Sequence, residues 1–178
     1  MRLDVFLTEK GLCESRQRAK LLIESGLVMQ NGRIAAKPAA TVAETDRIEI
    51  VGEALPYVSR GALKLEKAFE AFSLDAAGQT AIDVGASTGG FTEYLLLRGA
   101  VKVYAVDAGS GQLAAKLRAD ARVISMEKYN ARLLSPKDFP VPPTLAVMDV
   151  SFISQTLILP ALYSVLAERA LLVSLVKP

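Results

Sequence analysis

The sequence predicts an α/β protein in which a doubly wound parallel sheet follows a small module of mixed helix and strand. From residue 61 onward, apolar strand-like runs alternate with helix-like patterns, which is typical of a parallel sheet. The run Leu145–Met148 is apolar throughout, as expected of a strand that is buried on both faces. Residues 82–91 join a strand to a helix through a glycine-rich turn. We therefore expect a small domain at residues 1–53, a linker at 54–60 and the α/β domain at 61–178.

The composition is that of a globular chain, with 51% hydrophobic and 22% charged residues among 178. One cysteine, Cys13, allows no disulfide within the chain, which fits a reducing cytoplasm. The first residues lack the apolar stretch of a signal peptide. The longest apolar region, 157–176, is interrupted by Pro160 and by the adjacent Glu168 and Arg169, so it is a poor membrane span. We expect a cytoplasmic protein that does not enter a membrane.

Charge and residue types limit the chemistry that the chain can perform. The net charge of +2 says little about nucleic acid, and the chain contains no histidine. Acid–base catalysis must therefore use Lys, Asp, Glu, Tyr or the single Cys. The sequence predicts no metal site.

The first 53 residues contain short helices and an Asn-Gly turn. Ser15 is a suitable N-cap for a second helix, and Gly26 is a suitable stop for it. Asn31-Gly32 is the strongest short signal of a β-hairpin. The predicted elements are a helix from Leu3 to near Gly11, a helix over 16–25, a hairpin over 28–34 and a closing strand over 47–51.

Basic residues gather around the second predicted helix. Arg16 and Lys20 share one helix face, with Arg18 close by, and Arg33 and Lys37 follow in the next loop region. Such a cluster can bind phosphates, which predicts RNA binding, or it can be an ordinary solvated helix face. Charge alone leaves both interpretations open.

A family resemblance favours RNA binding. Residues 1–50 resemble the small RNA-binding domain named after ribosomal protein S4, in which the second helix and its flanking loop contact structured RNA. The resemblance implies an RNA-binding set to which we also assign Arg2 and, beyond the linker, Arg60. The matching residues are Arg2-Leu3-Asp4, Ser15-Arg16, Ala19-Lys20, Ile23, Gly26-Leu27-Val28, Asn31-Gly32, Lys37-Pro38 and Asp46-Arg47-Ile48.

Residues 61–178 predict five strands with helices between them. The strands are predicted at 80–84, 101–106, 122–125, 145–149 and 171–176. The helices are predicted at 62–72, 91–98, 112–117 and 155–167.

The turn after the first strand predicts a nucleoside pocket. Small residues let a ligand approach backbone N–H groups, and an acid after the second strand, Asp107, can bind ribose hydroxyls. The glycine spacing differs from the G-x-G-x-x-G of dinucleotide enzymes and suits S-adenosylmethionine better. The alternative is a tight turn that binds no ligand. The expected cofactor-binding residues are Asp83, Gly85, Ser87, Gly89, Gly90, Phe91 and Asp107, with Glu127 and Asn130 as weaker candidates for the adenine end.

Three further residues are candidates for catalysis. Asp149 ends the fourth strand and Lys177 follows the fifth, at the edge of the sheet where α/β proteins bind ligands. Lys64 lies on the helix before the first strand. Taken singly, the aspartate can be a helix cap and each lysine can be a solvated surface charge.

Together these motifs resemble the TlyA-type "hemolysin" family, which joins the RNA-binding domain to an FtsJ-like methyltransferase of Rossmann-like fold. The resemblance implies S-adenosylmethionine-dependent 2′-O-methylation of ribosomal RNA, with free RNA or a ribosomal subunit as partner. Three members of the family's Lys, Asp, Lys, Glu catalytic set match Lys64, Asp149 and Lys177. The matching runs are Ser59-Arg60-Gly61, Lys64-Leu65, 83–91, 149–154 and Val176-Lys177-Pro178.

The sequence ends directly after the fifth predicted strand. A full methyltransferase of this class continues with two more strands, which supply the last catalytic Glu. We therefore expect the catalytic set in these 178 residues to be one member short. Two alternatives stay open: an RNA-binding protein that keeps the fold without the activity, and a cytolysin, as the family's name suggests.

Overall fold

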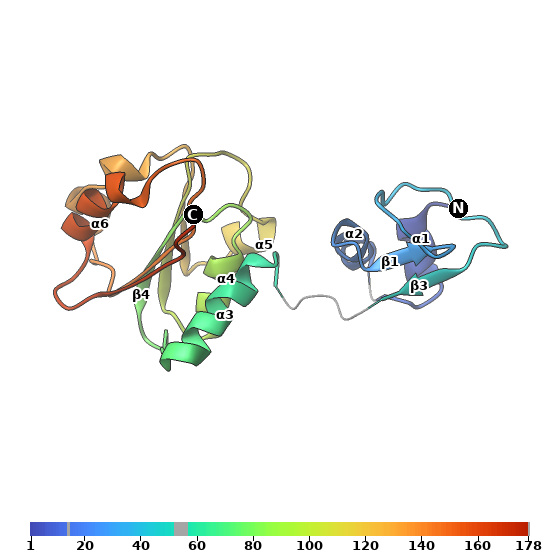
Figure 1. Cartoon of the computed structure of the whole chain (residues 1–178), viewed down its shortest axis with the longest axis horizontal. Helices are drawn as coiled ribbons and strands as arrows, with labels where there is room; N and C mark the ends of the chain where they lie inside the picture. Colours follow the sequence, from blue (N-terminus) through green and yellow to red (C-terminus); the bar gives the residue numbers. More distant parts are fainter. Residues whose placement is uncertain (14, 52–56, 178) are drawn as a thin grey trace. The chain divides into compact units, whose positions relative to one another are not determined.

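The computed structural model describes residues 1–13, 15–51 and 57–177. The chain divides into two compact units, residues 1–56 and 57–178, and each is described by itself (Figure 1). Part of the predicted linker, residues 54–56, lies outside the described residues, and residues 57–60 belong to the second unit.

The first unit packs two helices with a small antiparallel sheet. Helices α1 (Leu3–Glu9) and α2 (Arg16–Glu24) contact each other, and the strand order is β2-β1-β3. The Ser15 hydroxyl accepts a hydrogen bond from Arg18 N at 3.2 Å, so the predicted N-cap is confirmed. Asn31 and Gly32 have φ of 54° and 76°, as a two-residue hairpin of type I′ requires. The strands are β1 (Val28–Gln30), β2 (Arg33–Ile34) and β3 (Ile48–Ile50).

The second unit contains a parallel sheet of five described strands in the order β6-β5-β4-β7-β8. The predicted α/β class and parallel sheet are confirmed. The strand order extends from β4 in both directions, so the chain has a topological switch point between β4 and β7. The strands are β4 (Thr80–Val84), β5 (Lys102–Val106), β6 (Val123–Met126), β7 (Leu145–Met148) and β8 (Leu171–Ser174).

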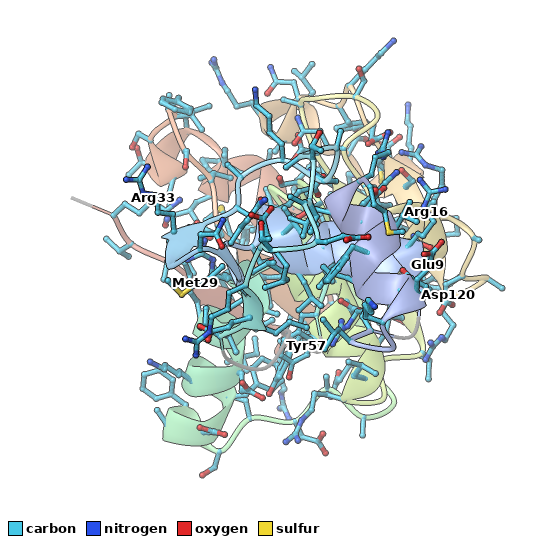
Figure 2. The ribbon with its side chains drawn as sticks, turned by 90° about the vertical axis from the view of Figure 1, so that its right-hand side faces the viewer. Glu9, Arg16, Met29, Arg33, Tyr57 and Asp120 are labelled. Carbon is cyan, nitrogen blue, oxygen red and sulfur yellow. The ribbon has the colours of Figure 1, made fainter. Side chains whose placement is uncertain are left out.

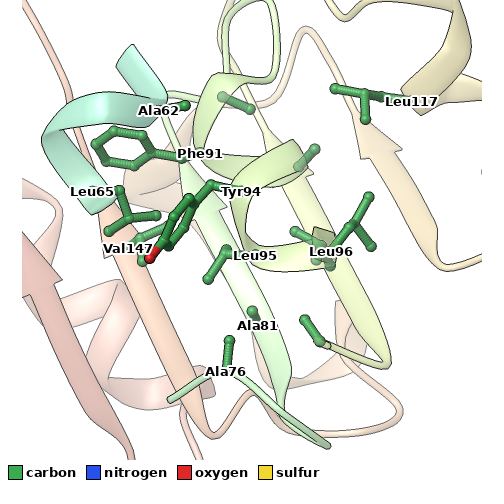
Figure 3. Packing of buried hydrophobic residues seen from close by; sticks show 14 of the residues in the cluster. Ala62, Leu65, Ala76, Ala81, Phe91, Tyr94, Leu95, Leu96, Leu117 and Val147 are labelled. Carbon is green, nitrogen blue, oxygen red and sulfur yellow. The ribbon is translucent and has the colours of Figure 1, made fainter. Parts of the chain in front are cut away.

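Helices cover both faces of this sheet, with α3 and α4 on one side and α6 on the other (Figure 1). In Figure 3, Leu65 of α3 lies beside Tyr94 of α4 above the sheet, and both are buried. The alternating residues of β4 divide between the two cores, with Ala81 in one and Ile82 in the other. The helices are α3 (Gly61–Phe72), α4 (Gly90–Leu97), α5 (Ala115–Arg118) and α6 (Leu159–Val165), and short 3₁₀ turns lie at Ala131–Leu133, Pro136–Asp138 and Gln155–Leu157.

Two predicted helices are wrong in extent. The helix expected at 112–117 is only α5, because Gln112 N and Leu113 N donate to the Glu127 carboxylate and the helix begins after them. The helix expected at 155–167 is a 3₁₀ turn followed by the shorter α6. Pro160 has no N–H and its ring would collide with the carbonyl four residues earlier, so α6 starts afresh with this proline in its first turn.

Candidate active site

The candidate site lies at the carboxyl ends of β4 and β7, which are neighbours at the switch point of the sheet. Asp149 N donates to Val84 O at 3.1 Å, so the first residues after the two strands are held side by side. Gly85 has φ of 86°, and a Cβ built on it would stand 2.6 Å from Asp149 O. Only glycine therefore fits between the two strand ends.

The three candidate catalytic residues meet at one carboxylate. Lys64 Nζ lies 3.1 Å from Asp149 Oδ2, and Lys177 Nζ lies 2.5 Å from Asp149 Oδ1. Asp149 is 17% exposed, while Lys64 is 49% and Lys177 38% exposed, so both ammonium groups stay accessible beside a mostly covered acid. A helix, a strand end and the chain beyond another strand thus supply one Lys-Asp-Lys group.

The two lysines differ in how firmly they are held. Lys177 Nζ also donates to Ser151 Oγ at 2.9 Å and to Val150 O at 3.3 Å. Lys64 Nζ donates only to Asp149 among the described residues. Lys177 is therefore held by Asp149 and by the loop after β7, whereas Lys64 is held by Asp149 alone among the described residues.

Gln155 is a residue of this region that sequence reasoning missed. Its Nε2 donates to Leu175 O at 2.5 Å, and its Oε1 accepts from Ser174 Oγ at 2.6 Å. One carboxamide thus ties the end of β8, two residues before Lys177, to the 3₁₀ turn after β7. No sequence motif signals this contact, because Gln155 and Ser174 meet only after the two strands have paired.

Asp83 lies at the carboxyl end of β4 and is 1% exposed. Its Oδ2 accepts a hydrogen bond from Thr92 Oγ1 at 2.7 Å, while its Oδ1 has no partner among the described residues. Burial raises the pKa of Asp83 to about 7, and the hydrogen bonds from Thr92 oppose that rise. The site therefore contains a buried carboxyl group in which one oxygen makes no hydrogen bond to the described residues.

Asp107 follows β5 and connects two loops. Its Oδ2 accepts from Ser87 N at 2.8 Å, and its Oδ1 accepts from Gly109 N at 2.7 Å. A carboxylate oxygen accepts more than one hydrogen bond, so each oxygen keeps capacity for a ligand hydroxyl. Ser87 has φ of 50°, a left-handed conformation that is uncommon outside glycine and often found at ligand sites.

The other two glycines of the turn allow neighbouring parts of the protein to pack closely against it. A Cβ on Gly89 would stand 2.3 Å from Leu117 Cδ1, and one on Gly90 would stand 2.2 Å from Ser59 Oγ. Phe91, predicted to bind the cofactor, is 7% exposed and belongs to the core between α3 and α4 (Figure 3). The turn is therefore shaped by α3 and α5 as much as by any ligand.

The two candidates for the adenine end already have local partners. Glu127 Oε1 accepts from Gln112 N and Leu113 N, and its Oε2 pairs with Arg118 at 3.0 Å. The hydrogen bond from Arg118 is the largest cause that lowers the pKa of Glu127 to about 2. Asn130 Oδ1 accepts from Arg132 N and caps a 3₁₀ turn. Both residues shape the loops near Asp107, and their contact with a cofactor stays a prediction.

Glu93, in the first turn of α4, is a second residue that sequence reasoning missed. It is 6% exposed, accepts a hydrogen bond from Val58 N at 2.5 Å, and pairs with Lys116 of α5. This carboxylate joins the start of the second unit to the two helices that flank the glycine turn.

In the first unit, a buried acid organises two of the candidate RNA-binding residues. Asp4 has no exposed surface, and its carboxylate accepts hydrogen bonds from Arg2 (2.9 and 3.0 Å) and from Arg16 (3.2 Å). The two arginine side chains are 50% and 57% exposed. Asp4 therefore holds two guanidinium groups together at the surface.

The remaining basic candidates do not form one cluster. In Figure 2, Arg16 and Arg33 lie on opposite sides of the first unit. The backbone next to Lys37 lies near Arg16, because Asp4, which binds Arg16, donates its N–H to Pro38 O at 3.0 Å. Lys20 and Arg33 are exposed, and Arg18 is half-buried. Arg60 is exposed at the start of α3 in the second unit.

The described residues contain neither a cluster of metal ligands nor a membrane-spanning helix. Among residues 1–13, 15–51 and 57–177, no three His, Cys, Asp or Glu side chains are grouped as a metal ion requires. In the same residues, no helix has the length and apolar character needed to cross a membrane.

Comparison with known proteins assigns each unit to a family. A model of FtsJ-like methyltransferases matches residues 57–178, and a model of the S4 domain matches residues 1–48. The chain is 48% identical to the 16S/23S rRNA (cytidine-2′-O)-methyltransferase TlyA of Mycobacterium tuberculosis, over 99% of this chain and 66% of that protein. It is 44% identical to hemolysin A of Brachyspira hyodysenteriae, over 100% of this chain and 74% of that protein.

A solved structure agrees with these relatives. It is described as "Putative hemolysin from Streptococcus thermophilus", with a TM-score of 0.72 and 48% identity over 99% of this chain and 66% of that chain. The chain thus spans just under two thirds of the length of TlyA and of this structure.

Proposed function

The chain belongs to the FtsJ-like methyltransferase family, and on that premise we propose that it serves the S-adenosylmethionine-dependent 2′-O-methylation of ribosomal RNA. TlyA of M. tuberculosis, a relative with 48% identity, is named for 2′-O-methylation of cytidine in ribosomal RNA. We assign RNA binding to residues 1–53 and the chemistry to residues 61–178. We also propose a cytoplasmic location for this activity, because ribosomal RNA is found there.

The residues around the switch point fit the proposed cofactor. Asp107 has free acceptor capacity for ribose hydroxyls, and Asp83 Oδ1 is a buried acceptor without a partner. Gly85 and Ser87 follow Asp83 in the turn, and Ser87 N donates to Asp107, so both residues lie at the strand ends where α/β proteins bind nucleotides. We propose that Asp83, Gly85, Ser87 and Asp107 contact the cofactor, and that Gly89 and Gly90 act by letting α5 and α3 approach the turn.

The Lys-Asp-Lys group carries the proposal. When bound, S-adenosylmethionine supplies an electrophilic methyl group on a sulfonium. A ribose 2′-OH is a weak acid and must lose its proton as it attacks, so it needs a base or a cation beside it. Lys64 and Lys177 contact opposite oxygens of Asp149. A lysine accepts a proton only as the neutral amine, so in this proposal one lysine loses its own proton before the transfer and takes the 2′-OH proton, while the other remains an ammonium and stabilises the developing alkoxide. Asp149 orients both.

The first unit supplies the RNA contacts in this proposal. Arg2 and Arg16, held by Asp4, present two guanidinium groups that fit phosphate oxygens. Lys37 follows on the same side, and we assign further, separate RNA contacts to Arg18, Lys20 and Arg33 of the first unit and to Arg60 of the second. Such contacts bind the RNA backbone and make affinity fall as salt rises.

Methyl transfer to ribosomal RNA tests the proposal. The substrates are ribosomal subunits and free RNA, with radiolabelled S-adenosylmethionine and the full chain. Lys64→Ala should lower the rate about 10²–10⁴-fold, the usual contribution of a general base. Lys67→Ala is the matched control, because Lys67 is exposed on the same helix and has no partner among the described residues. Equal rates in wild type and Lys64→Ala would contradict the assigned role.

The same assay separates the alternatives. RNA binding without methyl transfer by the wild-type chain would favour a non-catalytic RNA-binding protein. The name hemolysin belongs to relatives such as hemolysin A, and leakage of dye from phospholipid vesicles tests that activity. Leakage without RNA methylation would overturn the proposal.

A further inference from the structure

We infer that Gln112 contacts the cofactor. Its side-chain amide donates a hydrogen bond to a ribose hydroxyl, and the same hydroxyl donates a hydrogen bond to Asp107. The inference rests on the proposed function, because it takes an adenosine-containing cofactor as given. It adds a residue that neither the glycine turn nor the strand-end acids indicate.

The Gln112 side chain is anchored on one end only. Its Oε1 accepts a hydrogen bond from Ser87 Oγ at 3.2 Å. Its Nε2 donates to none of the described residues. A primary amide carries two donors on that nitrogen, so the carboxamide is oriented by the glycine turn and leaves its donors available.

The free amide nitrogen lies beside the acid that should bind ribose. A Cβ built on Gly109 would stand 2.1 Å from Gln112 Nε2 and 3.1 Å from Asp107 Oδ1, so these two atoms are no more than about 5 Å apart. A hydroxyl oxygen forms hydrogen bonds of about 2.7–3 Å to each neighbour, and it can bridge a gap of this size. The hydroxyl would donate to Asp107 and accept from Gln112.

The loop that carries Gln112 is fixed at several points. Gln112 N and Leu113 N donate to Glu127 at 2.9 and 3.1 Å, and Gly109 N donates to Asp107 at 2.7 Å. A Cβ on Gly109 would displace the Gln112 amide from its present position, because it would stand 2.1 Å from Gln112 Nε2. The loop backbone therefore holds the base of the Gln112 side chain in place, which reduces the ordering that binding requires.

Calorimetric titration of the full chain with S-adenosylhomocysteine, the demethylated form of the cofactor, tests the inference. Gln112→Ala should weaken binding roughly 3–10-fold, as expected for one neutral hydrogen bond. Gln112→Glu keeps an acceptor for Ser87 but loses both donors, so it should bind at least as weakly as Gln112→Ala. Ser110→Ala is the control in the same loop, since Ser110 is exposed and its side chain has no partner among the described residues.

Ligands that lack one hydroxyl sharpen the test. We expect the penalty of Gln112→Ala to disappear with either the 2′-deoxy or the 3′-deoxy form of S-adenosylhomocysteine, whichever lacks the bridged hydroxyl. An equal penalty with all three ligands would mean that Gln112 only supports the loop, and would overturn the inference. Equal affinity of wild type and Gln112→Ala would overturn it as well. Absence of binding by the wild-type chain would instead remove the cofactor from the proposed function.

Discussion

Each unit contains a buried aspartate near its candidate site, and the two acids respond to burial in opposite ways. Asp4 in the first unit has no exposed surface, and hydrogen bonds from Arg2, with further help from Arg16, hold its pKa well below the usual range. Asp83 in the second unit is 1% exposed, and burial raises its pKa to about 7. The sole side-chain partner of Asp83 among the described residues is the neutral Thr92 hydroxyl.

The comparison shows how charged partners oppose the effect of burial on a covered carboxyl group: the guanidinium groups outweigh it at Asp4, and the Thr92 hydroxyl does not outweigh it at Asp83. Arg2 and Arg16 satisfy both oxygens of Asp4, so its charge helps to stabilise the first unit. Asp83 Oδ1 has no partner among the described residues, so its charge costs stability until a ligand or water binds there. A paired acid such as Asp4 can hold surface arginines in place. An acid with an unpartnered oxygen, such as Asp83, can bind a ligand.

The largest effect is expected for Asp83→Asn. An acid whose pKa is raised by folding binds more protons when folded, so stability falls as the pH rises from about 4 to about 7. Removal of the ionisable group should stabilise the second unit by about 1–3 kcal/mol at pH 8, with roughly a third of that gain at pH 5. Urea unfolding at both pH values measures this difference.

Asp4 does not affect the change in stability between pH 5 and pH 8. With its pKa lowered, Asp4 is ionised in both the folded and the unfolded chain between pH 5 and pH 8 and adds nothing to the slope. The same decline in stability for wild type and Asp83→Asn would contradict the role given to Asp83.

The next effect is expected for Asp4→Asn. The substitution keeps the size of the side chain but removes the charge that Arg2 and Arg16 share, so the unfolding temperature of the first unit should fall by roughly 5–10 °C. Affinity for ribosomal RNA should fall with it, because the two arginines lose their common anchor. The wild-type unit should begin to lose the same stability as the pH falls below the unfolded value of 3.8, and the loss should continue until the pH passes the lowered pKa of folded Asp4.

Glu9→Gln is the matched control for Asp4→Asn. Glu9 lies on the same helix α1, is exposed, and has no partner among the described residues (Figure 2). Differential scanning calorimetry and filter binding at several salt concentrations measure both variants. If Glu9→Gln lost as much as Asp4→Asn, net charge and not the arginine pair would be responsible.

The smallest effect is expected for Thr92→Val. The variant keeps the branched shape but removes the hydroxyl that donates to Asp83 Oδ2 at 2.7 Å. The loss should be about 1 kcal/mol at pH 8, and smaller at pH 5 where Asp83 is protonated. Urea unfolding at the two pH values measures it, and an equal loss at both would show that packing of Thr92, and not its hydrogen bond, is at stake.

Much of the fold follows from local patterns in the sequence. The alternation of apolar strands with helices predicts the parallel sheet, and Ser15 and Asn31-Gly32 predict a helix start and a turn that the structure contains. The extent of the helices was harder to predict. The helix at 155–167 fails at Pro160, and the one at 112–117 is shortened because Glu127, distant in sequence, binds the backbone of Gln112.

Some features of the candidate site could likewise be predicted from the sequence, and others could not. Strand-end positions predict that Asp149 and Lys177 lie at one edge of the sheet, and the structure brings Lys64 to them from α3. The polar atoms that remain free could not be predicted, because neighbours from other elements decide this. Phe91 is covered by core packing, Glu127 and Asn130 are bound to nearby backbone, and Gln112 keeps its amide donors.

The sequence by itself determined the order of elements, the two family motifs and the residue types at the strand ends, because hydrophobic periodicity, glycine and proline act over a few residues. The tertiary structure alone decided which charges are paired. Asp4 and Asp83 look alike in the printed sequence, each a single acid within an apolar run. Arg2 and, from a second helix, Arg16 pair with Asp4, and no cation pairs with Asp83 within the described residues. Folding therefore lowers the pKa of one acid and raises the pKa of the other.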